Sequence, residues 1–207
     1  MKKKYVVLWM SIALLLLSSP VYSQIKLGFQ LGANSANANV DWEIEGKTNF
    51  FGGILAEFKI NDMFYIQPEI NFLSKGVTYN VRQNWDPPPY SYIIEDNWNY
   101  YEVTTNVLAK FDVGSFTPLL FAGPSLSFLS QAKSIYDGDE YDMSDLFKKF
   151  DFSINFGGGI ELSLSKSIDI FLMARYSLGL INILKYDAES EYNTRGLAVA
   201  TGLKFFI

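Results

Sequence analysis

The 207-residue chain contains no cysteine and no histidine. Without cysteine it can form neither a disulfide nor a thiolate metal site, and it cannot carry the lipid anchor of a lipoprotein. Without histidine it lacks the commonest general base and the commonest neutral metal ligand. Ser-His and Asp-His catalytic centres are therefore excluded, and we expect a protein that is not an enzyme and that uses no metal or cofactor.

Long hydrophobic runs are also scarce. The run at residues 5–17 follows three lysines at positions 2–4 and precedes small residues near position 23. It is shorter than the roughly 20 apolar residues that a membrane-spanning helix needs. The pattern is that of a secretory signal peptide, so we expect residues 1–23 to be removed and residues 24–207 to form one mature domain. A retained N-terminal anchor is the alternative.

Positive charge is limited as well. Of the 17 lysines and arginines, three lie in the expected signal peptide, which leaves 14 against 22 acidic residues in the mature chain. No basic stripe stands out, so nucleic acid is not an expected partner. No later apolar run approaches the length of a membrane helix. If this chain enters a membrane, it must do so as a closed β-barrel, the other structure that satisfies its own backbone in lipid.

The sequence does contain segments in which apolar and polar residues alternate with a period of two. In "DIFLMARYSLGL" (169–180), one face is continuously apolar and the other holds Asp169 and Arg175. Side chains of a β-strand alternate between two faces in this way. The same alternation indicates eight strands, at about residues 25–32, 51–60, 63–75, 101–111, 116–129, 150–162, 168–180 and 196–207.

The links between these strands alternate in length. Only "NDM", "DVGS" and "SKS" separate strands two and three, four and five, and six and seven. The other links are long, at residues 34–48, 76–98, 130–150 and 182–193. Transmembrane barrels have short periplasmic turns and longer extracellular loops, whereas a soluble sandwich has no reason to sort its links by length.

The two faces of the strands differ in chemistry. Charged residues share one face with glycine and small polar residues, and the opposite face has almost no ionisable group. Aromatic residues near both ends of the apolar face resemble interfacial girdles; they are Phe58, Phe64, Phe116 and Phe205 near the short turns, and Phe72, Tyr101, Phe128 and Phe152 near the long loops. We therefore predict an all-β fold, an eight-stranded antiparallel up-and-down transmembrane β-barrel. A soluble barrel with an aromatic core is the alternative.

Arg175 cannot lose its proton, so inside a barrel it must find a carboxylate or water. The inward faces supply both signs of charge, and we expect a self-neutralising network in the lumen. Its expected members are Arg175, Glu57, Glu69, Glu102, Lys110, Glu161, Asp169 and Lys204, with Lys26 and Lys59 also pointing inward. Which acid meets Arg175 depends on the shear of the barrel, which remains open at this stage.

The sequence gives only weak signals for a catalytic or ligand-binding site. Glu69 and Glu102 could imitate the carboxylate pair of a glycosidase, but lumen ion pairs are favoured because bases are equally abundant. The "GGG" at 157–159 lacks the Lys-Ser/Thr of a phosphate loop, and we expect it to make space for neighbouring side chains or to bend the sheet. The loop "NWDPPPYSYIIEDNWNYY" (84–101) is a candidate binding surface, or alternatively a self-packed cap on the barrel mouth. Its candidate binding residues are Trp85, Tyr90, Tyr92 and Trp98.

Several segments carry a family resemblance. They are "KLGFQLGAN" (26–34), "FYIQPEINFLSKG" (64–76), "YYEVTTNVLAKF" (100–111), "PLLFAGPSLSFL" (118–129), "FDFSINFGGGIEL" (150–162), "ARYSLGLINI" (174–183) and "GLAVATGLKFFI" (196–207). With them the mature chain resembles the PorT-like outer-membrane β-barrel family of Bacteroidetes. It departs from the family in having Thr104 where proline is frequent, and in ending on Ile207 rather than on phenylalanine.

The resemblance implies a location in the cell outer membrane, contact with lipid and lipopolysaccharide, and assembly by the barrel-assembly machinery. It also implies little assigned activity. The Trp- and Tyr-rich loop at 84–101 makes a protein partner at the extracellular loops a candidate. We expect an outer-membrane barrel with a lumen plugged by side chains and a structural or surface-interaction role. A narrow porin-like channel, a component of a secretion system and a barrel enzyme are the alternatives.

Overall fold

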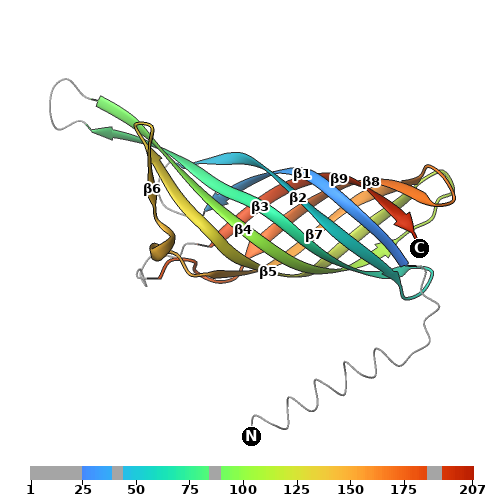
Figure 1. Ribbon diagram of the computed structural model, residues 1–207. Helices are drawn as coiled ribbons and strands as arrows, with labels where there is room; N and C mark the ends of the chain where they lie inside the picture. The colour runs from blue at the N-terminus through green and yellow to red at the C-terminus, as the bar shows by residue number, and fades with distance from the viewer. Residues whose placement is uncertain (1–24, 39–43, 84–89, 186–192) are drawn as a thin grey trace, which may run out of the picture.

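The computed structural model describes residues 25–38, 44–83, 90–185 and 193–207, and they form an elongated antiparallel β-structure (Figure 1). Its strands are β1 (Ile25–Ala38), β2 (Ile44–Lys59), β3 (Phe64–Gln83), β4 (Tyr90–Lys110), β5 (Thr117–Tyr136), β6 (Asp139–Asp142), β7 (Phe150–Ser163), β8 (Ile168–Gly179) and β9 (Thr194–Phe206), with one short 3-10 turn, η1 (Ser144–Leu146). Within these ranges, no helix is long and apolar enough to cross a membrane. The predicted signal peptide lies outside the described residues.

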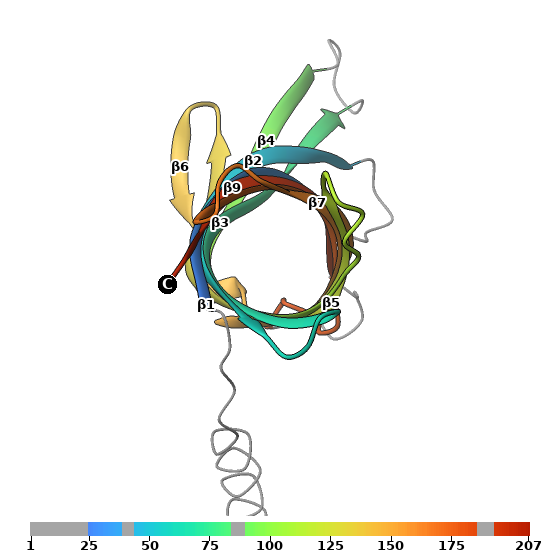
Figure 2. The same cartoon turned by 90° about the vertical axis from the view of Figure 1, so that its right-hand side faces the viewer.

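Eight of the strands close into a ring. Neighbouring strands run in the order β4-β3-β2-β1-β9-β8-β7-β5, and β5 pairs back with β4. First and last strands meet along a ladder from Lys26↔Phe206 to Ala38↔Thr194. The view along the axis shows this closed barrel, with β6 outside the ring (Figure 2). The predicted eight-stranded fold is thus confirmed, and closure leaves the barrel wall without an unpaired edge.

The predicted alternation separates an inner from an outer face. On β8, Leu172 is 50% exposed on the outside, while its neighbours Phe171 and Met173 are buried inside. On β4, Val103 is exposed, whereas Glu102 and Thr104 are buried. This exposure pattern is the reverse of a soluble barrel, because the apolar side chains point out and most of the buried side chains along β4 are polar.

The links predicted to be long are shorter than expected. Much of residues 34–48, 76–98 and 130–150 belongs to strands, and the β3–β4 ladder runs without interruption from Phe64↔Ala109 to Gln83↔Tyr90. Sequence alternation does not reveal these extensions because both faces of a strand beyond the barrel wall meet polar surroundings. The outcome is a sheet of β3, β4, β5 and β6 that projects past the barrel (Figure 1).

The opposite end of the barrel carries the three short turns and the C-terminus (Figure 1). In the first turn, the Asn61 side-chain oxygen accepts the backbone N–H groups of Met63 at 2.9 Å and Phe64 at 2.8 Å. In the second, Asp112 accepts the N–H of Gly114 at 2.9 Å, and Gly114 adopts a φ of 92° that suits glycine. Side-chain and backbone preferences of turn residues therefore set these tight connections.

Two chain segments pack together at the loop end of the barrel. Residues 143–149 and 181–185 meet at the bridge Phe147↔Leu184, and the Lys148 N–H donates to the Ile183 carbonyl at 2.7 Å. Phe147 and Ile183 are both buried, and the Phe147 ring lies 5.4 Å from that of Trp98. They join the apolar cluster that lines the upper lumen, so the chain itself covers part of the mouth; we call these two segments the cap.

Candidate functional site

An ionic layer fills the lumen near the short turns. Six strands each contribute one charged side chain that points inward; they are Lys26, Lys110 and Lys204 with Glu57, Glu161 and Asp169. All six are buried, and Lys204 is 0% exposed. Three ammonium groups face three carboxylates, so this layer has no net charge.

Glu161 lies at the centre of the layer. Its carboxylate accepts hydrogen bonds from Lys26 at 2.9 Å, from Lys110 at 2.9 Å and from Lys204 at 2.8 Å. Glu57 in turn accepts from Lys110 at 2.7 Å and from Lys204 at 2.6 Å. Such an interlocked set is costly to break, because removing one partner leaves a buried charge uncompensated.

Aromatic rings complete the surroundings of the same lysines. The ammonium nitrogen of Lys110 lies 4.6 Å from the centre of the Tyr65 ring, and that of Lys204 lies 4.9 Å from the centre of the Phe171 ring. These are cation–π distances. Each of these ammonium groups is thus enclosed by carboxylates and rings.

Apolar side chains form the next layer. On three of the strands an apolar residue lies two positions from the ionic one, as Leu55 does from Glu57 and Leu108 from Lys110. Because a strand repeats its faces every two residues, these side chains also point inward. The cluster consists of Leu55, Leu108, Leu119, Phe121, Phe171 and Met173.

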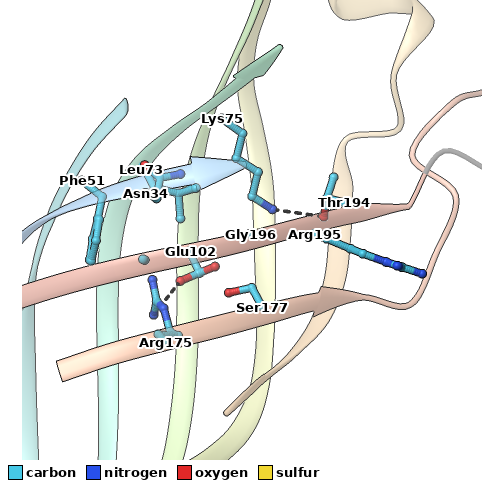
Figure 3. A pocket seen from close by; sticks show the side chains of 11 residues that line it. Asn34, Phe51, Leu73, Lys75, Glu102, Arg175, Ser177, Thr194, Arg195 and Gly196 are labelled. Atoms are coloured by element: carbon cyan, nitrogen blue, oxygen red, sulfur yellow. Dashed lines mark hydrogen bonds and ion pairs between the residues drawn. The ribbon is translucent and has the colours of Figure 1, made fainter. Parts of the chain in front are cut away.

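Arg175 lies in a second polar layer beyond the apolar one, and it meets two acids. Its terminal Nη1 lies 3.3 Å from Glu102 Oε1 and 3.6 Å from Glu69 Oε2. Figure 3 shows the guanidinium reaching toward Glu102. Glu69 also accepts four side-chain amide hydrogen bonds, at 2.8–3.1 Å; the donors are Gln30, Gln67, Asn71 and Asn106.

A further ion pair lies nearer the mouth, and it is absent from the sequence prediction. Lys75 bonds to Asp151 at 3.0 Å, and the Thr194 hydroxyl donates to Asp151 at 2.8 Å. The alternation of each strand could have indicated that both side chains point inward. Asp151 is two residues from the inward Ser153, and Lys75 shares the polar face of its segment. The pairing itself joins strands 76 positions apart in sequence.

Lys59 is not part of the lumen, which corrects the prediction. It pairs with Asp62 at 2.8 Å across the first short turn, and its side chain is partly exposed. The reason is its position as the last residue of β2, where the strand leaves the barrel. The hydrogen bond from Lys59 holds the pKa of Asp62 below its usual value.

Two small cavities lie among the described residues of the lumen. The larger cavity, of about 20 Å³, lies beside Lys75, Glu102 and Arg175 (Figure 3). A second, of about 10 Å³, lies beside Glu69 and Met173. A single water needs roughly 10–15 Å³ by this measure, so each cavity described here has room for about one water. Side chains, rather than solvent, fill the described lumen.

The structure places the candidate binding residues of the loop at 84–101 in different surroundings, or does not describe them. Trp98 is 2% exposed and packs in the cap, so its prediction as part of a binding surface is wrong. Its inward parity and the insertion of Phe147 explain the burial. Tyr92 lies on the projecting sheet, with its ring 5.1 Å from that of Tyr136. Trp85 and the side chain of Tyr90 lie outside the described part of the chain.

The outer surface of the barrel carries a belt of exposed apolar residues with aromatic ends. At the loop end, strand pairing aligns four exposed rings in one row across four strands, Phe72, Tyr101, Phe128 and Phe150. At the turn end, the predicted Phe58, Phe64, Phe116 and Phe205 are exposed. A soluble protein rarely exposes so continuous an apolar surface, whereas a membrane barrel requires it.

Known structures share this architecture. Neisserial surface protein A (NspA) aligns with a TM-score of 0.57 and 14% identity, over 88% of this chain and 97% of that one. OprG from Pseudomonas aeruginosa aligns with a TM-score of 0.48 and 11% identity, over 89% and 95%. Ail of Yersinia pestis aligns with a TM-score of 0.46 and 12% identity, over 88% and 99%. At 14% identity, the likeness to NspA concerns the fold alone.

The comparison with curated protein sequences finds no significant match. A family model described as "Outer membrane protein beta-barrel domain" matches residues 18–185, which is most of the chain. The match agrees with the closed barrel, the inward charges and the apolar belt, and it places the protein in the outer membrane. The chain belongs to the outer membrane protein beta-barrel domain family.

Proposed function

We propose that this outer-membrane barrel does not conduct and has no enzymatic activity, and that it serves a structural or surface-interaction role. The observation that carries the proposal is the ionic layer around Glu161. Six charged side chains, joined by hydrogen bonds, meet across the lumen there.

The rest of the lumen supports the same reading. Conduction needs a continuous path for water and ions, and an eight-stranded barrel is just wide enough to be filled by its own side chains. Here the ionic layer is followed by an apolar layer, a second polar layer and the cap of Phe147 and Ile183. The two cavities near Arg175 have room for about one water each.

A plugged barrel can act through what it presents outside. The sheet formed by β3, β4, β5 and β6 projects from the loop end, which is the extracellular end in barrels with short periplasmic turns. NspA, which shares the fold, is itself named as a surface protein. We therefore place the interaction site on the projecting sheet, with a protein partner as its occupant.

Further proposals rest on the sequence. Residues 1–23 are a signal peptide, and residues 24–207 are the mature barrel, a member of the PorT-like group that is delivered by the barrel-assembly machinery. The mature barrel contacts lipid and lipopolysaccharide through its apolar belt. A role in a secretion system, as in a few members of that group, is the second candidate, which copurification of secretion partners would favour.

Planar-bilayer recording of the purified barrel tests the main proposal. We expect no stable conductance steps, while a 16-stranded porin inserted in the same bilayer conducts and shows that the assay works. Liposome swelling with small sugars should likewise show no influx. Steady conductance by the native barrel would instead establish the narrow-channel alternative.

A further inference from the structure

The projecting sheet has two unlike faces. One face is the continuation of the inner face of the barrel wall. On this face, strand pairing places Ile94, Tyr136 and Asp139 side by side, and it places Ser134 beside Tyr141. The other face carries the ion pair Lys133–Glu140. Since directly paired residues of neighbouring strands point to the same side, one face is rich in tyrosine and the other is ion-paired.

The tyrosine face is accessible. Tyr136 is 40% exposed and Tyr141 is 50% exposed, and Tyr92 stands edge-on to Tyr136 at 5.1 Å. Tyrosine offers a large, rigid contact area together with a polar end, which makes it one of the residues most enriched at interfaces.

The hairpin that carries Tyr136 and Tyr141 is acidic. The hairpin of residues 133–145 contains one lysine and five acidic residues. Two of the acids are engaged locally, because Glu140 pairs with Lys133 and Asp142 accepts the Ser144 N–H at 2.8 Å. Asp139 is exposed on the tyrosine face, directly opposite Tyr136.

The hairpin is also well defined in shape. Asp137 and Gly138 both have positive φ, at 50° and 87°, as the two central residues of a tight hairpin turn require. The turn therefore holds β6 against β5 with Tyr141 and Asp139 on one side. A preorganised surface loses less freedom on binding than a flexible loop.

We propose that this tyrosine face, formed by Tyr136, Tyr141 and Asp139, binds an arginine- or lysine-bearing polypeptide segment of an extracellular partner. Charge complementarity selects a cationic occupant, and the rings add cation–π contacts that a carboxylate cluster alone would lack. The inference rests on the proposed surface-interaction role and names the chemistry of its partner.

The test uses the full barrel in detergent and fluorescein-labelled nona-arginine, with binding read by fluorescence anisotropy. Nona-arginine should bind, more weakly at high salt, and nona-glutamate should not. The double variant Tyr136→Ala/Tyr141→Ala should weaken binding by about tenfold, the size expected for two lost ring–cation contacts. Tyr101→Ala, in the membrane girdle, is the matched control and should bind like the native barrel.

Adjacent acids on opposite faces give the sharper comparison. Asp139→Asn and Glu140→Gln remove the same charge one residue apart, and Asp139→Asn alone should weaken binding. Equal loss in both variants, or binding unaffected by the tyrosine substitutions, would mean general attraction and overturn the proposal. Binding of neutral maltohexaose in place of the peptide, or self-association through this face, would overturn it in favour of a sugar or a second copy.

Folding of every variant is checked by its altered migration on unboiled gels. A folded barrel that does not conduct and ignores the peptide refutes this inference and leaves the proposed function standing. A conducting barrel refutes the proposed function, whatever the peptide does.

Discussion

The Arg175 guanidinium lies 3.3 Å from the Glu102 carboxylate, and this one cation also faces Glu69 at 3.6 Å. Two buried carboxylates therefore share a single arginine. Four amide donors supply Glu69 with the hydrogen bonds that the shared arginine does not. These hydrogen bonds satisfy the oxygens of a buried carboxylate, so the layer depends jointly on Arg175 and on the amides.

Replacing Arg175 with alanine should lower stability by about 3–5 kcal/mol if the site stays dry, and by less if the adjacent cavity admits water. The reason is that Glu69 and Glu102 lose the arginine that they share. Urea unfolding of the refolded barrel measures the effect, with the exposed Arg195→Ala as control. Altered ion selectivity at unchanged stability would instead show that Arg175 lines a channel.

Glu161→Gln should destabilise the barrel by a similar 3–5 kcal/mol or so, because three lysines would then face only Glu57 and Asp169. The matched control is Glu140→Gln on the projecting hairpin, where an exposed pair contributes about 0–1 kcal/mol. Thermal unfolding followed by gel migration compares the two. Equal small effects would contradict an interlocked ionic layer.

Leu172→Arg should block assembly, because a charge on the lipid face near the midplane costs about 2–4 kcal/mol. Met173→Gln, on the lumen side one residue along, should be milder. The amount of folded barrel recovered in outer membranes measures both. The same sensitivity at the two positions would reverse the assignment of inner and outer faces.

Gly157→Ala should destabilise more than Gly158→Ala. A β-carbon on Gly157 would approach the Ala174 carbonyl oxygen to 2.1 Å and the Phe121 ring to 2.7 Å, whereas one on Gly158 would find its nearest atoms at 3.1 Å. Forcing a methyl group into such a packed position typically costs about 1–3 kcal/mol. Urea midpoints of the two variants give the comparison, and a larger loss at Gly158 would contradict it.

The glycine triplet illustrates what can be inferred locally. Its sequence suggests space for neighbours, and the structure identifies Phe121 and Met173 as the side chains that occupy this space beside Gly157 and Gly159. These neighbours come from β5 and β8. The sequence alone predicts that side chains need space beside these glycines, whereas strand pairing determines which side chains occupy it.

The sequence by itself determines part of the architecture. Face assignment, strand number and turn positions follow from a two-residue period and from short links such as "NDM", because alternation is a local property of the extended chain. The inward direction of Glu57, Glu161 and Arg175 follows from the same parity. The absence of cysteine and histidine narrows the chemistry before any folding is considered.

The tertiary structure alone decides which charges meet and which aromatic residues are covered. Lys26 bonds Asp169 across 143 positions at 2.6 Å, and the shear of the closed barrel, a property of all eight strands together, sets that meeting. Trp98 is buried because Phe147 inserts above it from a distant segment. Parity states which way a side chain points, but the packing of remote strands and loops determines what it touches.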